Sequence, residues 1–188
     1  MADSRSLVSR MVRAAKLEVD LYGEVEADTT ANGQALLAVL IASVASGIGV
    51  AIAELLLEER AIWFLWGLLI GLVTGIVGWF AWSLLAYWLG ITIFKGPETS
   101  ATYGELLRTI GFSNSPRVLS FLFFVPYLGG LIAFIVSVWA LIAGVIAVKQ
   151  ALDLSTWRAI GTCVMGWIIY TLLQSLALWL ALGGKALT

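Results

Sequence analysis

Histidine is absent from this 188-residue chain, and cysteine occurs only once. Without histidine the chain has no imidazole base, no histidine ligand for haem and no histidine-containing zinc site. Cys163 lies inside an apolar run, where we expect a small buried residue rather than a disulfide partner. Paired carboxylates in a pocket-like setting, a nucleophile beside a base and a phosphate-binding loop are also missing. The sequence therefore predicts a protein that is not an enzyme, with no catalytic residue, cofactor or metal.

Charge is scarce as well, and it is absent from long stretches. Charged residues make up 12% of the chain, against roughly 25% in a soluble domain. Asp, Glu, Lys and Arg are all missing from residues 29–53, 61–94, 118–148 and 159–184. Each stretch exceeds the about 20 apolar residues that a helix needs to cross a bilayer. This pattern predicts an all-α, polytopic membrane helical bundle, and the net charge of −1 gives no reason to expect a nucleic-acid partner.

The third apolar stretch decides whether the bundle has five transmembrane helices or four. It contains Pro126 followed by Gly129-Gly130, residues that interrupt a helix and permit a reversal. A hairpin there gives five spans, whereas one continuous helix gives four. For the five-span arrangement we expect spans at about 33–53, 66–89, 110–125, 131–148 and 160–182.

The distribution of basic residues favours five spans, because cytoplasmic segments are enriched in Lys and Arg. Five spans place nine basic residues on one side and two on the other, whereas four spans place eight against three. The nine are Arg5, Arg10, Arg13, Lys16, Lys95, Arg108, Arg117, Lys149 and Arg158. The count predicts a cytoplasmic N-terminus and a C-terminus outside, in what we expect to be a bacterial plasma membrane.

Residues 1–32 are expected to form a cytoplasmic segment ahead of the transmembrane domain at 33–188. Within it, residues 4–19 have the pattern of a basic amphipathic helix, with an apolar stripe that includes Leu7, Val8 and Met11. Such a helix lies either on an anionic inner leaflet or on the protein's own loops. Membrane lipids are therefore the first partner that the sequence indicates.

The second span carries a ladder of glycines on one face: Gly67, Gly71, Gly75 and Gly78. Glycines at this spacing let another helix approach closely. That helix belongs either to the same chain, to a second copy in a homo-oligomer, or to another membrane protein.

Arg117 is the only charged residue that the five-span arrangement places inside a span. An arginine in a membrane is costly unless it reaches the interface or pairs with an acid. It follows Pro116, so we expect a broken helix near the inner surface, with Asp20 or Glu105 as the candidate acid. The interaction candidates are Asp20, Tyr22, Gly23, Tyr103, Gly104, Pro116 and Arg117.

Two motifs on the predicted cytoplasmic side make the chain resemble the Yip1-domain family, especially its short bacterial members. Asp20-Leu21-Tyr22-Gly23 is similar to the family's Asp-Leu-Tyr-Gly-Pro signature, with Glu24 in the place of proline. The second motif runs from Thr102-Tyr103-Gly104-Glu105-Leu106-Leu107-Arg108 through Gly111-Phe112 to Pro116, and the similarity continues over Trp139, Lys149-Gln150-Ala151, Leu154-Ser155 and Arg158-Ala159.

The resemblance implies five membrane helices, a cytosolic N-terminus and a short non-cytosolic tail. Eukaryotic members are associated with trafficking and Rab GTPases, but the short N-terminal segment and Glu24 argue against a Rab-binding role here. Our leading hypothesis is a membrane-organising or trafficking-like adaptor that acts through its cytoplasmic face. The alternatives are an accessory subunit of a larger membrane complex and a small transporter or lipid-handling channel.

Overall fold

The described part of the chain is helical. The computed structural model describes residues 5–58 and 61–183, and within them it contains no strand. The elements are α1 (Leu7–Ala15), α2 (Val19–Ala27), the short 3-10 helix η1 (Thr29–Ala31), α3 (Asn32–Glu58), α4 (Ala61–Thr92), α5 (Tyr103–Ser113), the 3-10 helix η2 (Ser115–Phe124), α6 (Gly129–Ala151) and α7 (Thr156–Gly183). The prediction of an all-α bundle is confirmed.

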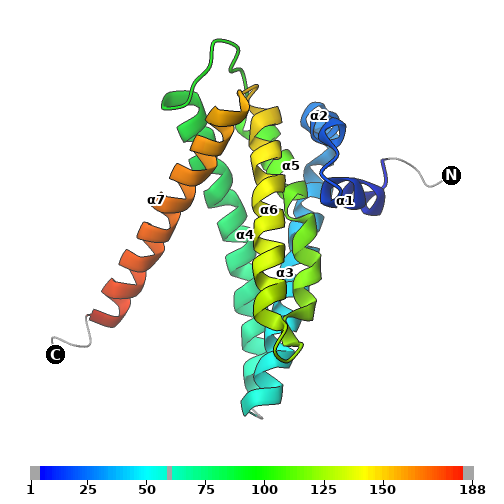
Figure 1. Cartoon of the computed structure of the whole chain (residues 1–188), viewed down its shortest axis with the longest axis vertical. Coiled ribbons are helices and arrows are strands. Elements are labelled where there is room, and N and C mark those ends of the chain that lie inside the picture. Colours follow the sequence, from blue (N-terminus) through cyan, green and yellow to red (C-terminus); the bar gives the residue numbers. More distant parts are fainter. Residues whose placement is uncertain (1–4, 59–60, 184–188) are drawn as a thin grey trace.

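The long helices run between two ends of an elongated bundle, and the polar segments collect at one of them (Figure 1). We call this the upper end: it carries α2 and the loop that joins α4 to α5. From there α3 descends, α4 returns, α5 and η2 descend together, α6 returns and α7 descends. The helices α3, α4 and α6 each contain a stretch long and apolar enough to cross a membrane, at Thr29–Ala53, Gly71–Thr92 and Gly129–Ala151.

The third apolar stretch is a hairpin, as Pro126 and the glycines predicted. Helix α5 ends at Ser113, η2 starts two residues later with Pro116 in its first turn, and a turn at 125–128 leads into α6. The glycines do not supply the left-handed residue of this turn, because Tyr127 adopts φ 64° and no described glycine has a positive φ. Gly129 is needed for space instead: a Cβ there would overlap the carbonyl oxygen of Phe123.

The expected amphipathic helix over residues 4–19 is two helices rather than one. Helix α1 starts after Ser6, whose hydroxyl accepts a hydrogen bond from the Ser9 amide at 3.3 Å. The chain then turns at Leu17, which adopts φ 61°, and α2 begins at Val19. The turn folds α1 back against α2, and this reversal has no marker in the sequence, since leucine rarely adopts a positive φ.

Helices α1 and α2 share one core with the membrane helices. Ala14, Leu21, Tyr22 and Val25 are fully buried in the same cluster as residues of α3, α5 and α6. Small residues bring the descending segments together, since a Cβ at Gly111 would press on Ala35 and one at Gly49 would overlap the Ser120 carbonyl. The N-terminal segment is therefore packed on the bundle and forms the upper end with it.

Candidate functional site

Arg10 occupies the centre of the junction between α1, α2 and the start of α3. Its side chain is only 2% exposed, yet it carries a full positive charge. The guanidinium donates to Glu24 at 2.9 and 3.1 Å, to Asp28 at 2.7 Å and to Gln34 at 2.9 Å. Two carboxylates and an amide oxygen from three elements thus hold one buried cation, which fixes α1 in position against α2 and α3.

The two carboxylates are held in their charged forms by these contacts. Burial alone would raise the pKa of Glu24, but hydrogen bonds from Arg13 and Arg10 outweigh it, so this pKa is lowered. The Thr30 hydroxyl and then Arg10 lower the pKa of Asp28 to about 2. Arg13 adds a second connection across the turn, with bonds of 2.7 Å to Glu24 and 3.0 Å to Glu18.

Arg108 is the second buried cation at the upper end, and it binds the end of a helix. It is 5% exposed, and its Nε donates to the Val25 carbonyl at 2.9 Å, while another guanidinium nitrogen donates to the Glu26 carbonyl. These carbonyls belong to the last turn of α2, where the helix dipole favours a positive charge. A third bond of 3.3 Å reaches the side-chain oxygen of Asn32. Arg108 therefore ties α5 to the end of α2 and the beginning of α3.

The first motif lies at the start of α2, and its members differ in exposure. Asp20 is exposed in the first turn, whereas Tyr22 is fully buried and donates its hydroxyl to the Ala14 carbonyl at 3.4 Å. Gly23 faces α6, where a Cβ would lie 4.0 Å from the side-chain nitrogen of Gln150. Of the three interaction candidates in this motif, Asp20 is the exposed one, and Tyr22 acts on its surroundings through packing.

The second motif opens α5 with a reciprocal cap. The Thr102 hydroxyl accepts from the Glu105 amide, and the Glu105 carboxylate accepts from the Thr102 amide at 2.7 Å. Tyr103 donates its hydroxyl to the Phe80 carbonyl at 2.9 Å, which joins α5 to α4. Gly104 lies beside Arg108, whose guanidinium nitrogen would be 3.4 Å from a Cβ at that position. Arg108, the last residue of the Thr102–Arg108 run, thus links α5 to the last turn of α2, the helix that carries the first motif.

Pro116 and Arg117 lie away from this junction. Pro116 is buried in the first turn of η2, whereas Arg117 is exposed. In the described part of the chain Arg117 forms no ion pair with Asp20 or Glu105, which corrects that suggested pairing. Asp20 lies at the upper end and Glu105 is engaged in the cap, so neither is placed to neutralise a side chain further down η2.

The glycine ladder of α4 packs inside the chain. A Cβ at Gly75 would overlap the Ser43 hydroxyl, and one at Gly71 would lie 4.0 Å from the Gly47 Cα, so both glycines face α3. Gly78 faces α7, with the Tyr170 hydroxyl 3.5 Å from where its Cβ would be. The fourth position, Gly67, lies outside the residues whose side chains the structure describes. Of the three arrangements that the motif left open, packing within one chain accounts for these three glycines.

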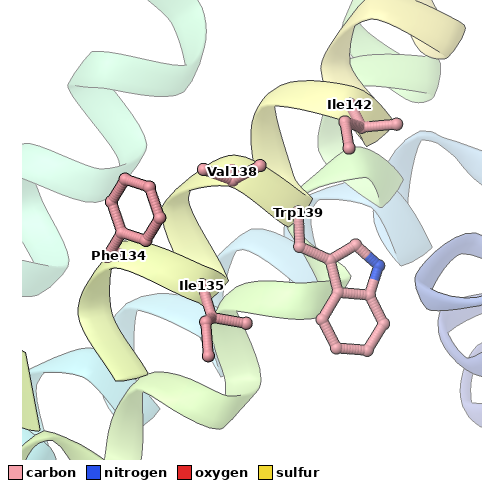
Figure 2. A pocket seen from close by; sticks show the side chains of 5 residues that line it. All are labelled: Phe134, Ile135, Val138, Trp139 and Ile142. Atoms are coloured by element: carbon pink, nitrogen blue, oxygen red, sulfur yellow. The ribbon is translucent and has the colours of Figure 1, made fainter. Parts of the chain in front are cut away.

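The outward face of α1 is apolar. Val8 is 70% exposed and Val12 is 48% exposed, while Arg10 and Ala14 point inward. The indole of Trp139 on α6 donates to the Ala15 carbonyl at 2.7 Å and so fastens the end of α1 to the bundle. Around Trp139, α6 presents a shallow apolar surface lined by Phe134, Ile135, Val138, Trp139 and Ile142 (Figure 2). Arg10 thus faces protein, whereas Val8 and Val12 face outward.

Sequence reasoning did not single out Arg10 and Arg108 as the residues that assemble this site. In the sequence, Arg10 belongs to the expected basic amphipathic helix and Arg108 to the second motif, and neither position indicates that its side chain is buried. A signal for Arg10 exists in two nearby acids, Glu24 and Asp28, which are four residues apart, with Asp28 directly after the end of α2. Arg108 had no comparable signal, because its partners are mainly backbone carbonyls.

The contacts of Arg10 and Arg108 hold α1, α2, α3 and α5 together at the upper end. Among the residues that the structure describes, no group of three or more His, Cys, Asp or Glu could hold a metal ion. A bundle of apolar helices with one polar end defines an integral membrane protein.

Comparison with known proteins places this membrane protein in a family. The model of the Yip1 domain family matches residues 22–182, which is most of the chain; it includes the whole second motif and begins at Tyr22 of the first. The chain belongs to the Yip1 domain family, as the resemblance indicated. No curated protein and no solved structure matched the chain.

Proposed function

We propose that this protein is a non-enzymatic adaptor that organises membranes from a cytoplasmic face formed by its upper end. The support is the assembly of α1, α2 and α5 around Arg10 and Arg108, which gives the chain a fixed polar surface at one end. The proposal includes a bacterial plasma membrane as location and five spans, with the N-terminus in the cytoplasm and the C-terminus outside.

The path of the chain supports five spans. The chain passes between the ends along α3, α4, the α5–η2 pair, α6 and α7 (Figure 1). Glu98 lies in the upper loop, and Leu128 lies in the turn below η2, where it is 51% exposed. Cysteine at Glu98 should react with a membrane-impermeant maleimide only in inverted vesicles, and cysteine at Leu128 only in intact cells. Labelling of both positions from the same side would refute this topology.

Helix α1 provides the contact with lipid in this proposal. Val8 and Val12 on this helix point away from the protein, while Arg10 is buried within it. The two valines can therefore insert into the adjacent membrane surface. Cys163 is 1% exposed, so a cysteine introduced at Val8 can be labelled selectively with a fluorophore. Brominated lipids should quench a label at position 8 strongly and one at Glu18, which is exposed beyond α1, weakly. Equal quenching would count against the membrane-surface role of α1.

The partner surface is the corner where α1 turns into α2. Lys16, Glu18, Val19 and Asp20 are all exposed there, next to the network that fixes both helices. A photoreactive amino acid at Asp20 should give a discrete protein adduct in native membranes. Arg10→Met, which removes the contacts that hold α1 against α2, should reduce the yield of this adduct. The matched control carries the same photoreactive group at Leu172, an exposed apolar position of α7. Identical adducts from both positions, or none from Asp20, would contradict the adaptor role.

A further inference from the structure

The loop that joins α4 to α5 packs on the beginning of α7. A Cβ at Gly161 would lie 2.5 Å from the ring of Phe94, so this ring rests against the backbone of α7. Two residues further along the loop, a Cβ at Gly96 would lie 2.6 Å from a terminal nitrogen of the Arg158 guanidinium. The Gly96 amide closes a turn of the loop, because it donates to the Thr99 hydroxyl at 2.7 Å. The loop and the first turns of α7 thus form one surface at the upper end (Figure 1).

This surface brings together two cations from segments far apart in the chain. Lys95 directly precedes Gly96, over which the Arg158 guanidinium lies, and both basic side chains are exposed. In the described part of the chain neither forms an ion pair, although Glu98 lies in the same loop and Asp153 in the turn before α7. Neighbouring positive charges repel each other, and an anion from outside the chain would offset both.

Exposed apolar residues adjoin the two cations in the sequence. Trp157, next to Arg158, is 83% exposed, and Ile93, two residues before Lys95, is 53% exposed. Lys95 follows the candidate span Gly71–Thr92 by three residues, so this surface lies where the apolar part of α4 ends. Tryptophan and basic residues at the end of a span are side chains that contact lipid headgroups. The surface therefore combines positive charge with exposed apolar area at the end of a membrane helix.

We propose that Lys95 and Arg158 bind the anionic headgroup of a membrane lipid, with Trp157 inserted beside it. The guanidinium presents donors in a plane that suits two phosphate oxygens, and the ammonium of Lys95 adds a second positive charge. Charge complementarity selects an anionic headgroup. The exposed indole selects a lipid over a soluble anion, because a soluble anion has no apolar part for the indole to contact. The site lies on different elements from the corner at Asp20, so its test is independent of the adaptor role.

Native mass spectrometry of the purified full chain measures how strongly it retains phosphatidylglycerol and zwitterionic phosphatidylcholine. Lys95→Gln and Arg158→Gln should each weaken phosphatidylglycerol binding about fivefold, as expected for one basic residue beside an anionic headgroup. The double variant should weaken it by more than about tenfold, because the two cations act on the same headgroup. Phosphatidylcholine has no net charge, so its binding should change much less. Arg158→Lys keeps the charge and should retain most of the affinity for phosphatidylglycerol.

Glu98→Gln is the matched control, because it removes a charge of the opposite sign from an exposed position of the same loop. It should not weaken phosphatidylglycerol binding. The side chains of Lys95 and Arg158 are exposed as well, so all these variants are expected to fold. Equal phosphatidylglycerol affinity for the double variant and the unmodified protein would overturn the proposal, and so would an equal loss of affinity in Glu98→Gln.

Two further measurements separate a lipid from other anions that fit two cations. Inorganic phosphate should not displace phosphatidylglycerol from the purified protein, and a photoreactive amino acid at Lys95 should capture lipid in native membranes. Displacement by inorganic phosphate would show a site for a soluble anion. A protein adduct at this position in place of lipid would show an acidic partner. Either of these results overturns the assignment to lipid.

Discussion

Replacing Arg10 by methionine should release α1 from the rest of the protein while leaving the bundle folded. Methionine keeps a flexible apolar stem in the buried position but removes every hydrogen bond of the guanidinium. Glu24, Asp28 and Gln34 then lose their common partner, and Ala14 and Trp139 remain to hold α1. The change is therefore expected to act locally on α1 and its turn.

The expected loss of stability depends on how deeply the arginine and its two carboxylate partners are buried. Removing one partner of a fully buried ion pair costs about 3–5 kcal/mol, because the remaining charge stays without water. Here the arginine is 2% exposed, but Glu24 and Asp28 are 31% and 25% exposed, so the remaining carboxylates regain part of their hydration. We therefore expect a loss of about 3 kcal/mol in the free energy of opening α1, toward the lower side of that range.

Hydrogen exchange of the α1 backbone measures this opening. A loss of about 3 kcal/mol raises the exchange rate of protected α1 amides about a hundredfold when opening limits exchange at equilibrium. Amides of α4 and α6 should not change. Lys16→Met is the matched control, because Lys16 is exposed and lies at the other end of the same helix. Exchange of α1 that changes less than threefold in Arg10→Met would refute the view that this network fixes the helix.

Three further predictions concern packing and pH. Gly75→Leu should lower thermal stability in detergent by about 1–3 kcal/mol because it overpacks against Ser43, whereas Gly144→Leu, which meets no atom within 4 Å, should be neutral. Folding lowers the pKa of Asp28 to about 2. The stability that Asp28 contributes should therefore be complete above its unfolded pKa of about 3.9 and should disappear as the pH falls toward 2. Hydrogen exchange of α1 should become faster over that pH range, and an exchange rate without this change would exclude the contribution. Tyr22→Ala should lower the free energy of unfolding, measured by thermal melting, by about 3–5 kcal/mol, since the ring is fully buried. Tyr22→Phe should lower it by under about 1.5 kcal/mol, since only one hydrogen bond of 3.4 Å is lost. Similar losses for the two variants would mean that the hydroxyl matters more than the packing.

Much of the bundle could be read from the sequence because it follows from composition along the chain. The charge-free stretches marked the long helices, and Pro126 marked the reversal before α6. The break at Pro116 was also predictable, since proline removes a backbone donor and disfavours a continuous helix. These are local constraints, and each acts within a few residues of its cause.

The candidate sites could be predicted only in part, because they depend on contacts between distant segments. Tyr22 and Asp20 looked equivalent in the sequence, yet one is buried and the other exposed. Glu24 and Asp28 offer two acids for a cation, but the turn at Leu17 has no sequence marker, so the sequence does not show that Arg10 is the cation that meets them.

By itself, the sequence determined that this is an all-α membrane protein and approximately where its long apolar helices lie, because a bilayer imposes its demands on each segment separately. Its motifs also determined membership of the Yip1 domain family. Only the tertiary structure decided which charges are paired. It placed Arg10 among acids and Arg108 on the carbonyls at the end of a helix, and it left Arg117 exposed. The physical reason is that the state of a charge depends on its neighbours in space, and packing between segments far apart in the chain sets those neighbours.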